Sequence, residues 1–473
     1  MDFCKDYYLR TFRTDVRQME KIVGQALNDG GDWCDLYFEY TTYNELMLRD
    51  SEVTSGGFHI DYGVGVRVLS GDRTGYAYSE STEYEDMLAA ARAASAVAIA
   101  AQEKNMFRNC TYTVKDSFYR DLQPWKNASA AGFITFLKDL EQRIRTKDAR
   151  AAKIIARLSY SHSDILMFNS LGELACDSRP LGSVTVSVIF STDGRTQSKS
   201  ASRSFRCGAE MVGDSLAEEL AEEAVRGIDS LFEARRPKGG NMAVVMGAGA
   251  SGILLHEAMG HAFEADFNRK GQSVFAEKMG QRICPEGIDI IDDGTIPGNR
   301  GACNFDDEGV PGQKTWMVRD GVLTSYLHDR VSARHYGVEP TGNGRRESFR
   351  FAPLPRMRAT YMDNGTANPA SIIADVRKGI YVDEFSNGQV KIGEGDFTFY
   401  VKSGFLIENG RLTAPVKDIN IIGNGPQALA DILAVGNDLK IDDGTWTCGK
   451  EQSVAVSVGM PTVLVKSLTV GGE

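Results

Sequence analysis

The spacing of apolar residues in the first half of the chain predicts helices packed against an antiparallel sheet. Apolar side chains recur every three or four residues over 14–27, which is typical of an amphipathic helix. Further helices are expected over 83–102, 131–145 and 214–228. Strands are expected over 34–48, 57–69 and 75–78, followed by a meander of four short strands over 152–161, 165–168, 174–177 and 183–190. This pattern favours an α+β fold, and no catalytic constellation is visible within it.

Turn signals become dense in the second half, and the segment ARRPKGG over 234–240 is a natural boundary. We therefore predict two domains, residues 1–235 and residues 236–473. Asp-Gly and Asn-Gly pairs predict hairpins or turns at 293–294, 320–321, 387–388, 409–410 and 443–444. The C-terminal domain is expected to be β-rich, barrel-like or sandwich-like, with one helical island over 251–266.

Composition narrows the class of protein. The 473 residues are 42% hydrophobic and 25% charged, an ordinary globular balance, and no run is long and apolar enough to span a membrane. We expect no membrane partner. The formal charge of -11 argues against direct nucleic-acid binding, which relies on clustered Lys and Arg.

The eight cysteines are scattered and form no CxxC pair. This usage favours reduced, mostly buried thiols, and the N-terminal residues lack the apolar run of a signal peptide. A cytoplasmic location is therefore predicted. The cysteines are Cys4, Cys34, Cys110, Cys176, Cys207, Cys284, Cys303 and Cys448.

Residues 247–252 read GAGASG, which formally matches the dinucleotide fingerprint GxGxxG. A plausible strand over 242–246 precedes it and a helix follows. However, no strand ending in an acid follows at about 20 residues, as that fold requires. We favour a turn of small residues that brings the strand close to the helix, with a dinucleotide-dependent oxidoreductase as a rival.

The helical island contains HEAMGH, in which His256 and His261 flank Glu257. Two imidazoles and a carboxylate are the parts of a metalloprotease site: two ligands and a base. On a regular α-helix, positions i and i+5 lie about 140° apart, so both rings can reach one metal only if the helix widens. We predict a π-type turn eased by Gly260. The simpler alternative is that both are ordinary helix residues.

A zinc site needs a third protein ligand, and spacing alone does not identify it. Cys448 stands out slightly because it lies in the Gly-flanked segment GTWTCGKEQS, although a single Cys is more often a buried apolar residue. The candidates are Glu264, Asp266, His328, His335, Cys284, Cys303 and Cys448.

Several sequence blocks, in order along the chain, resemble the TldD branch of the TldD/PmbA (TldD/TldE) metalloproteases, a family also known by the older name of modulator of DNA gyrase. The resemblance is dense from Met242 to the C-terminus and weaker before it, at GVGVRVL and GYAYS. The blocks are HEAMGHAFEADFNRKGQSVF, DDEGVPGQ, PTGNGRRES, PRMRATYM, GIYV, VGNDLK, CGKEQS and LTVGG.

This resemblance implies a zinc-dependent peptidase that acts on unstructured or small peptides, including modified peptides of the microcin type. It assigns Zn²⁺ to His256, His261 and Cys448 and the general base to Glu257. It also implies a dimer, either with a TldE/PmbA-like subunit that lacks the metal ligands or with a second copy. The family pattern after the cysteine is near CGKxGQ, whereas CGKEQ here lacks the second Gly, which puts the shape of this loop in question.

Other interpretations remain open. A non-catalytic regulatory protein of the gyrase-modulator type is the main alternative, although the intact HExxxH motif points away from it. Arg345, Arg346, His328 or a backbone amide of a Gly-rich loop could stabilise an oxyanion, but a solvated turn is the simpler interpretation of the two arginines. The acidic segments 292–294 and 306–309 lack the order of a calcium loop and are interpreted as turns.

Overall fold

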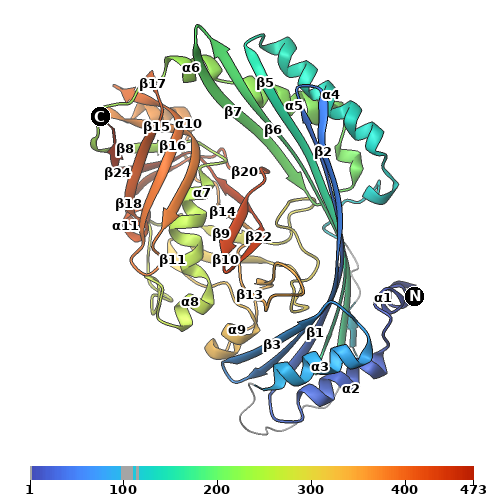
Figure 1. The fold of residues 1–473 in the computed structure, drawn as a ribbon. Coiled ribbons are helices and arrows are strands. Elements are labelled where there is room, and N and C mark those ends of the chain that lie inside the picture. Colours follow the sequence, from blue (N-terminus) through green and yellow to red (C-terminus); the bar gives the residue numbers. More distant parts are fainter. Residues whose placement is uncertain (1–2, 97–109, 113–116, 473) are drawn as a thin grey trace.

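The computed structural model describes residues 3–96, 110–112 and 117–472. Residues up to 205 form one sheet of seven strands in the order β3-β2-β1-β5-β6, with β4 and β7 both paired to β6. This sheet curves as a long half-barrel around the C-terminal half of the chain (Figure 1). Its strands are β1 (Trp33–Arg49), β2 (Glu52–Ser70), β3 (Arg73–Ser79), β4 (Cys110–Tyr112), β5 (Ala151–Asn169), β6 (Glu173–Thr192) and β7 (Arg195–Phe205).

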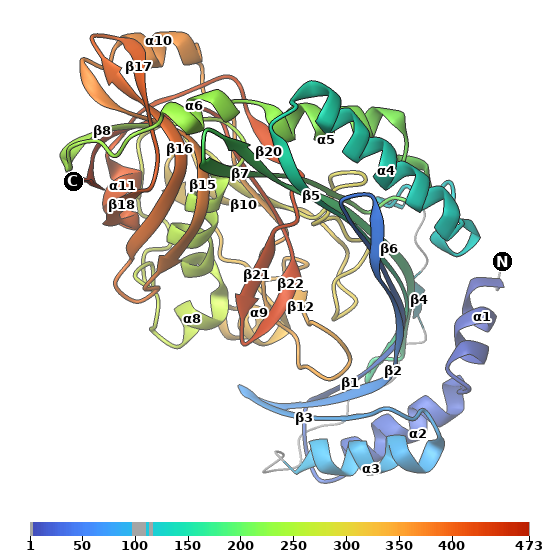
Figure 2. The same cartoon turned by 45° about the horizontal axis from the view of Figure 1, so that its top comes forward.

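Helices cover the convex face of this sheet at its two ends (Figures 1 and 2). The pair α2 and α3 packs over β1 to β3, and the pair α4 and α5 packs over β5 to β7, each with its own apolar core. The predicted α+β architecture is therefore confirmed. The helices are α1 (Phe3–Thr11), α2 (Val16–Ala26), α3 (Tyr84–Ser95), α4 (Ala130–Lys147), α5 (Asp214–Val225) and α6 (Ile228–Glu233), with short 3-10 turns at Trp125–Asn127 and Ala209–Met211. The last part of the helix expected over 83–102 lies outside the described residues.

The predicted meander of four short strands is wrong, because β5 and β6 are two long strands. The polar segments that suggested breaks stay in register, with Tyr160 opposite Gly182 and Asp164 opposite Ser178. Backbone pairing on both sides of β5 satisfies these residues, so polarity marks a solvated or charged stretch of the sheet and does not end the strand.

The second half of the chain is built around a closed barrel of five strands. The ring runs β15-β8-β24-β18-β16 and closes through pairing of β16 with β15. A six-stranded sheet in the order β11-β10-β9-β14-β23-β20 lies beside it (Figure 1). The strands are β8 (Gly240–Met246), β9 (Ile290–Asp293), β10 (Lys314–Arg319), β11 (Val322–Leu323), β12 (Gly344–Arg345), β13 (Leu354–Pro355), β14 (Ala359–Met362), β15 (Lys378–Val390), β16 (Asp396–Glu408), β17 (Arg411–Val416), β18 (Ile419–Asn424), β19 (Ile432–Val435), β20 (Lys440–Asp442), β21 (Thr447–Lys450), β22 (Gln452–Ala455), β23 (Ser457–Met460) and β24 (Val463–Gly471).

Helical segments lie between the barrel and this second sheet or at their edges. Residues of the predicted helical island share one apolar core with the barrel strands and with β9, β10, β14 and β23. The segments are α7 (Gly252–Leu255), the π-helix His256–Gly260, the 3-10 helix His261–Phe263, α8 (Ala265–Arg269), α9 (Arg330–Tyr336), α10 (Pro369–Ala374) and α11 (Gly425–Ala430). No helix in the described part of the chain combines the length and apolarity needed to cross a membrane.

Two predictions that involve glycine have opposite outcomes: the close approach at GAGASG is confirmed, and the turn at 387–388 is wrong. A Cβ on Gly252 would lie 2.4 Å from the backbone of Gly459, so the GAGASG segment does let the helix approach β23 closely. Its strand β8 is parallel to β15 but antiparallel to β24 in a barrel, unlike a doubly wound nucleotide-binding sheet. By contrast, the turn predicted at 387–388 is wrong: Gly388 lies inside β15, where a Cβ would collide with the ring of Phe399.

Buried ion pairs join the concave face of the N-terminal sheet to the C-terminal half. Arg67 binds Glu308 at 2.5 Å, and Arg179 binds Asp307 at 2.5 Å. Residues 306–309 do form a turn, as predicted, but the turn is buried and its carboxylates anchor the two halves. The predicted solvated turn at Arg345 and Arg346 is wrong, since both side chains are buried.

Candidate metal centre

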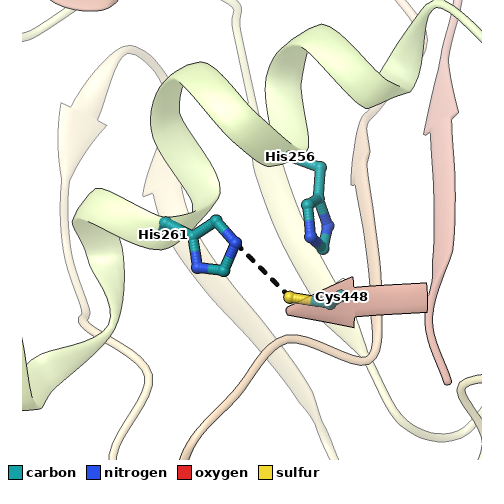
Figure 3. A group of neighbouring side chains, drawn as sticks. All are labelled: His256, His261 and Cys448. Carbon is teal, nitrogen blue, oxygen red and sulfur yellow. Dashed lines mark hydrogen bonds between the residues drawn. The ribbon is translucent and has the colours of Figure 1, made fainter. Parts of the chain in front are cut away.

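The helix that carries HEAMGH widens where the spacing requires it. After α7, residues His256–Gly260 form a π-helix, and the amide of His261 donates to the carbonyl of His256. The extra residue in this turn brings both imidazoles to one face of the helix (Figure 3). A Cβ on Gly260 would lie 2.2 Å from Sδ of Met357, so any other residue at this position would require the Met357 side chain to shift. The predicted π-type turn is confirmed.

Cys448 approaches the two imidazoles from the hairpin of β21 and β22 (Figure 3). One ligand atom each from His256, His261 and Cys448 lie within 4.8 Å of one another, and all three residues are buried. The Cys448 Sγ lies 3.4 Å from Nε2 of His261. Three polar groups from two distant segments therefore converge on one point.

The remaining third-ligand candidates do not join this group in the described part of the chain. Glu264 contacts the opposite ring nitrogen of His261, and Asp266 contacts Lys450. His328 is buried near Tyr326 and Tyr336, and burial lowers its pKa to about 4. His335 lies beside Asp72, whereas Cys284 and Cys303 are buried free thiols.

The donor set fits a zinc ion. Both ring nitrogens of His256 are buried, and neither has a hydrogen-bond partner in the described part of the chain, an arrangement that costs free energy unless a cation is bound. Two imidazoles and a thiolate are ligands that zinc prefers, and ligand atoms around tetrahedral zinc lie about 3.5 Å apart. Burial alone would raise the pKa of Cys448, but the two imidazoles outweigh it and lower that pKa to about 4. The sulfur is therefore poised as a thiolate.

A buried ionic network holds the ligands in place. Nδ1 of His261 lies 2.9 Å from Oε2 of Glu264, which also accepts from Nζ of Lys450 at 3.1 Å. Lys450 is fixed in turn by Asp266 at 2.7 Å. Arg356 donates to the carbonyl of Cys448 at 2.7 Å and to that of Gln452 at 2.9 Å. Such a carboxylate–histidine pair orients the ring and fixes which nitrogen faces the metal.

Glu257 differs from Glu264 in accessibility. Its side chain is 24% exposed, whereas that of Glu264 is fully buried, and its Oε2 lies 4.0 Å from Nε2 of His261. Nε2 is the ring nitrogen that faces Cys448. Glu257 thus borders the candidate centre while remaining partly exposed to solvent.

Sequence reasoning missed the supporting network. Glu264 and Asp266 were considered only as metal ligands, and Lys450 and Arg356 were not considered. One signal was available for Lys450: it lies two residues after Cys448 on a strand, so both side chains are on the same face of the hairpin.

The convergent His-His-Cys group defines this chain as a candidate metal-binding protein, and comparison with known proteins gives the family. Three family models match the chain: PmbA/TldA metallopeptidase domain 1 over residues 34–98, the central domain over 123–228 and the C-terminal domain over 239–472. The chain belongs to the PmbA/TldD metallopeptidase family.

Relatives with curated names carry the same description. A metalloprotease TldD homolog of Haemophilus influenzae is 38% identical over 93% of each chain. A zinc metalloprotease TldD homolog of Saccharolobus solfataricus is 33% identical over 50% of this chain and 53% of its own. These names favour a metalloprotease over the non-catalytic regulatory alternative.

Solved structures share the fold. TldE from Thermococcus kodakarensis superposes with a TM-score of 0.73 at 19% identity, covering 96% of this chain and 100% of its own. A Thermotoga maritima protein described as a modulator of a DNA gyrase superposes with a TM-score of 0.78 at 22% identity, covering 96% and 99%. At these identities the likeness concerns the fold alone.

Proposed function

We propose that this chain is a zinc-dependent peptidase that hydrolyses peptide bonds in unstructured or small peptides. His256, His261 and Cys448 would hold the ion, and Glu257 would be the general base. The observation that carries the proposal is the buried convergence of these three side chains beside a carboxylate that solvent can reach. The metalloprotease names of relatives that align over nearly the whole chain support it.

When bound, a zinc ion supplies Lewis acidity at this position, polarising a carbonyl and lowering the pKa of water. The residues of the chain do the rest. Glu257 accepts a proton from the attacking water and returns it to the leaving amine. Glu264 keeps His261 oriented with Nε2 toward the ion, and Arg356 fixes the hairpin that presents Cys448.

The substrate is expected to bind as an extended chain. A β-rich domain can take up a peptide backbone as an added strand, which gives low sequence selectivity and excludes folded proteins. We further propose that the active form is a cytoplasmic dimer, with a TldE/PmbA-like subunit or with a second copy. The shared fold with TldE is consistent with such a pairing.

The decisive variant is Glu257→Gln, which keeps the shape of the side chain and removes the base. We expect about one bound zinc per chain and a loss of peptide hydrolysis of roughly 100-fold or more. Zinc is measured by atomic absorption and hydrolysis by mass spectrometry of an unstructured peptide. Glu286→Gln, at an exposed glutamate, is the control and should match the parent. Full activity of Glu257→Gln would exclude Glu257 as the base.

A further inference from the structure

A cavity of about 170 Å³ lies between the concave face of the N-terminal sheet and the C-terminal half. Tyr37, Glu39 and Ile165 line it from the sheet, and Ser453, Val454 and Ala455 line it from β22. Val454 is the register partner of Cys448 in the hairpin. The cavity therefore lies against the same hairpin that presents the thiolate to the candidate metal centre.

Five arginines line this cavity: Arg179, Arg206, Arg345, Arg346 and Arg358. Two of them are matched by carboxylates, since Arg179 pairs with Asp307 at 2.5 Å and Arg346 lies 3.5 Å from Asp35. The other three form no ion pair with any described residue. Their guanidinium groups therefore lie in a largely buried space without a directly paired carboxylate.

The contacts of these three guanidinium groups use backbone carbonyls. Arg345 donates to the carbonyls of Met357 and Ala455, and Arg206 donates to those of Arg300 and Pro180.

Arg358 donates through Nε to the carbonyl of Gly342 at 2.7 Å, and no bond to a described residue is found for its two terminal nitrogens. Burial and the neighbouring Arg358 lower the pKa of Arg345 to about 9, as expected where cations crowd without partners.

The acidic residues around the cavity are already engaged. Asp306 accepts from the amides of Glu308, Val310 and Gly344. Glu39 accepts from Thr41 and from the amide of Phe349.

Glu347, at the exposed rim, accepts from the amide of Ser453. None of these carboxylates forms an ion pair with Arg206, Arg345 or Arg358, so a carboxylate that entered the cavity would meet guanidinium groups that are not already paired.

The cavity adjoins a larger groove. This hollow of about 500 Å³ lies along the middle of the N-terminal sheet, and most of its lining is glycine, serine and tyrosine, with Glu45, His59 and Arg300 as the charged or titratable residues. Tyr43, Ser161 and Leu181 line both spaces. A chain lying in the groove could thus place a charged group among the arginines.

We propose that this arginine cavity binds a carboxylate carried by a peptide. The proposal rests on the proposed peptidase function and adds a substrate feature to it: a peptide with a carboxylate at the right distance is held more tightly than one without. A planar guanidinium with two free N–H groups, as in Arg358, matches the two oxygens of a carboxylate.

The test measures binding in the Glu257→Gln background, so that no peptide is consumed. Calorimetry compares an unstructured, N-acetylated peptide ending in a free carboxylate with the same peptide ending in an amide. A second pair, both amidated, carries Glu or Gln at the penultimate position. Inorganic phosphate is titrated separately as a competitor. The expected result is at least about 10-fold tighter binding of the carboxylate member in one of the two pairs, and that pair identifies the source of the carboxylate.

Adding Arg358→Gln should abolish the difference within the favoured pair and leave binding of the uncharged member unchanged. Arg319→Gln, which removes an exposed arginine, is the matched control and should preserve the difference. If Arg358→Gln unfolds the protein, Arg206→Gln replaces it, and both peptide pairs are informative with the arginines intact.

Equal binding within both pairs overturns the proposal, as does binding of phosphate with no preference for peptide carboxylates. These outcomes are distinct from failure of the peptidase function, which is shown by undiminished cleavage by Glu257→Gln.

Discussion

The N-terminal sheet and the C-terminal barrel are both curved, but they differ in regularity. Strands β1, β5 and β6 run for 17 to 20 residues, and β1 pairs with β5 without a register shift. In the barrel, the pairing of β15 with β16 shifts register three times. The candidate metal centre lies where regular structure breaks, at a π-turn and a one-residue hairpin turn. The regular sheet therefore contributes buried charged residues that face the C-terminal half, whereas local irregularities packed against the barrel position the candidate metal ligands.

If the candidate metal centre lies wholly in the C-terminal half, the largest effect on zinc content should come from replacing Cys448. Cys448→Ser replaces the sulfur with a poor zinc ligand, so bound zinc should fall from about one per chain to a small fraction, and peptide hydrolysis should fall roughly 100-fold or more. Zinc is measured after dialysis. Cys284→Ser, at a buried cysteine of the same apolar core, should keep its zinc. Full zinc occupancy in Cys448→Ser would remove this residue from the ligand set.

A smaller effect is expected from the supporting network. Glu264→Gln removes the carboxylate that orients His261, which should lower zinc affinity by about 10- to 100-fold. Competition with a chelator of known affinity measures it. Asp266→Asn is a close control because Asp266 contacts Lys450 but not His261, and its loss of affinity should be clearly smaller. Equal losses in the two variants would mean that the network acts as a whole and not through the imidazole.

Substitutions in the N-terminal sheet should change the stability of the protein and not its zinc content. Burial raises the pKa of Glu39 to about 7, above its ordinary value of 4.5. An acid with a raised folded-state pKa binds protons more tightly when folded, so the contribution of Glu39 to stability is greatest below about pH 4.5 and is lost as the pH rises to about 7. The decline attributable to Glu39 should be on the order of 3 kcal/mol.

Glu39→Gln should flatten this decline, which thermal unfolding at pH 5 and pH 8 measures. Glu45→Gln, on the same strand, should keep the slope of the parent. Zinc content should be unchanged in both variants. A loss of zinc in Glu39→Gln would show that the N-terminal sheet also affects the candidate metal centre, against the separation proposed here.

The same difference in regularity decided how far the sequence could be interpreted. Periodicity located α2 closely, because its buried residues form one face of the helix. β1 was located by its β-rich, partly alternating residues, although the first half of this strand is buried on both faces. It failed for β5 and β6, whose polar middle residues are satisfied by neighbouring strands. The buried turn at 306–309 was interpreted as an ordinary turn because its ionic partners lie on distant strands.

The candidate centre shows the same limit. The spacing of His256 and His261 was enough to predict a π-turn, because helical geometry is local. Cys448 is 187 residues from His261. Its Gly-flanked segment favoured it only slightly over the other candidates, and the family resemblance assigned it. Contacts across such separations depend on the tertiary fold, which local spacing does not contain. Lys450 could have been placed beside Cys448 once a strand was assumed.

The smallest predicted effect concerns the departure from CGKxGQ. The hairpin closes without the second glycine, with Lys450 opposite Gln452 and Glu451 alone at the tip. Glu451 adopts a φ of 58°, a left-handed conformation that costs free energy for any residue with a Cβ. Glu451→Gly should therefore stabilise the chain by up to about 1 kcal/mol, raising the melting temperature by a few degrees at most. Glu451→Ala removes the same charge and keeps the Cβ, so it should give no gain. An equal gain from both variants would assign the effect to loss of the carboxylate and not to relief of backbone strain at this position.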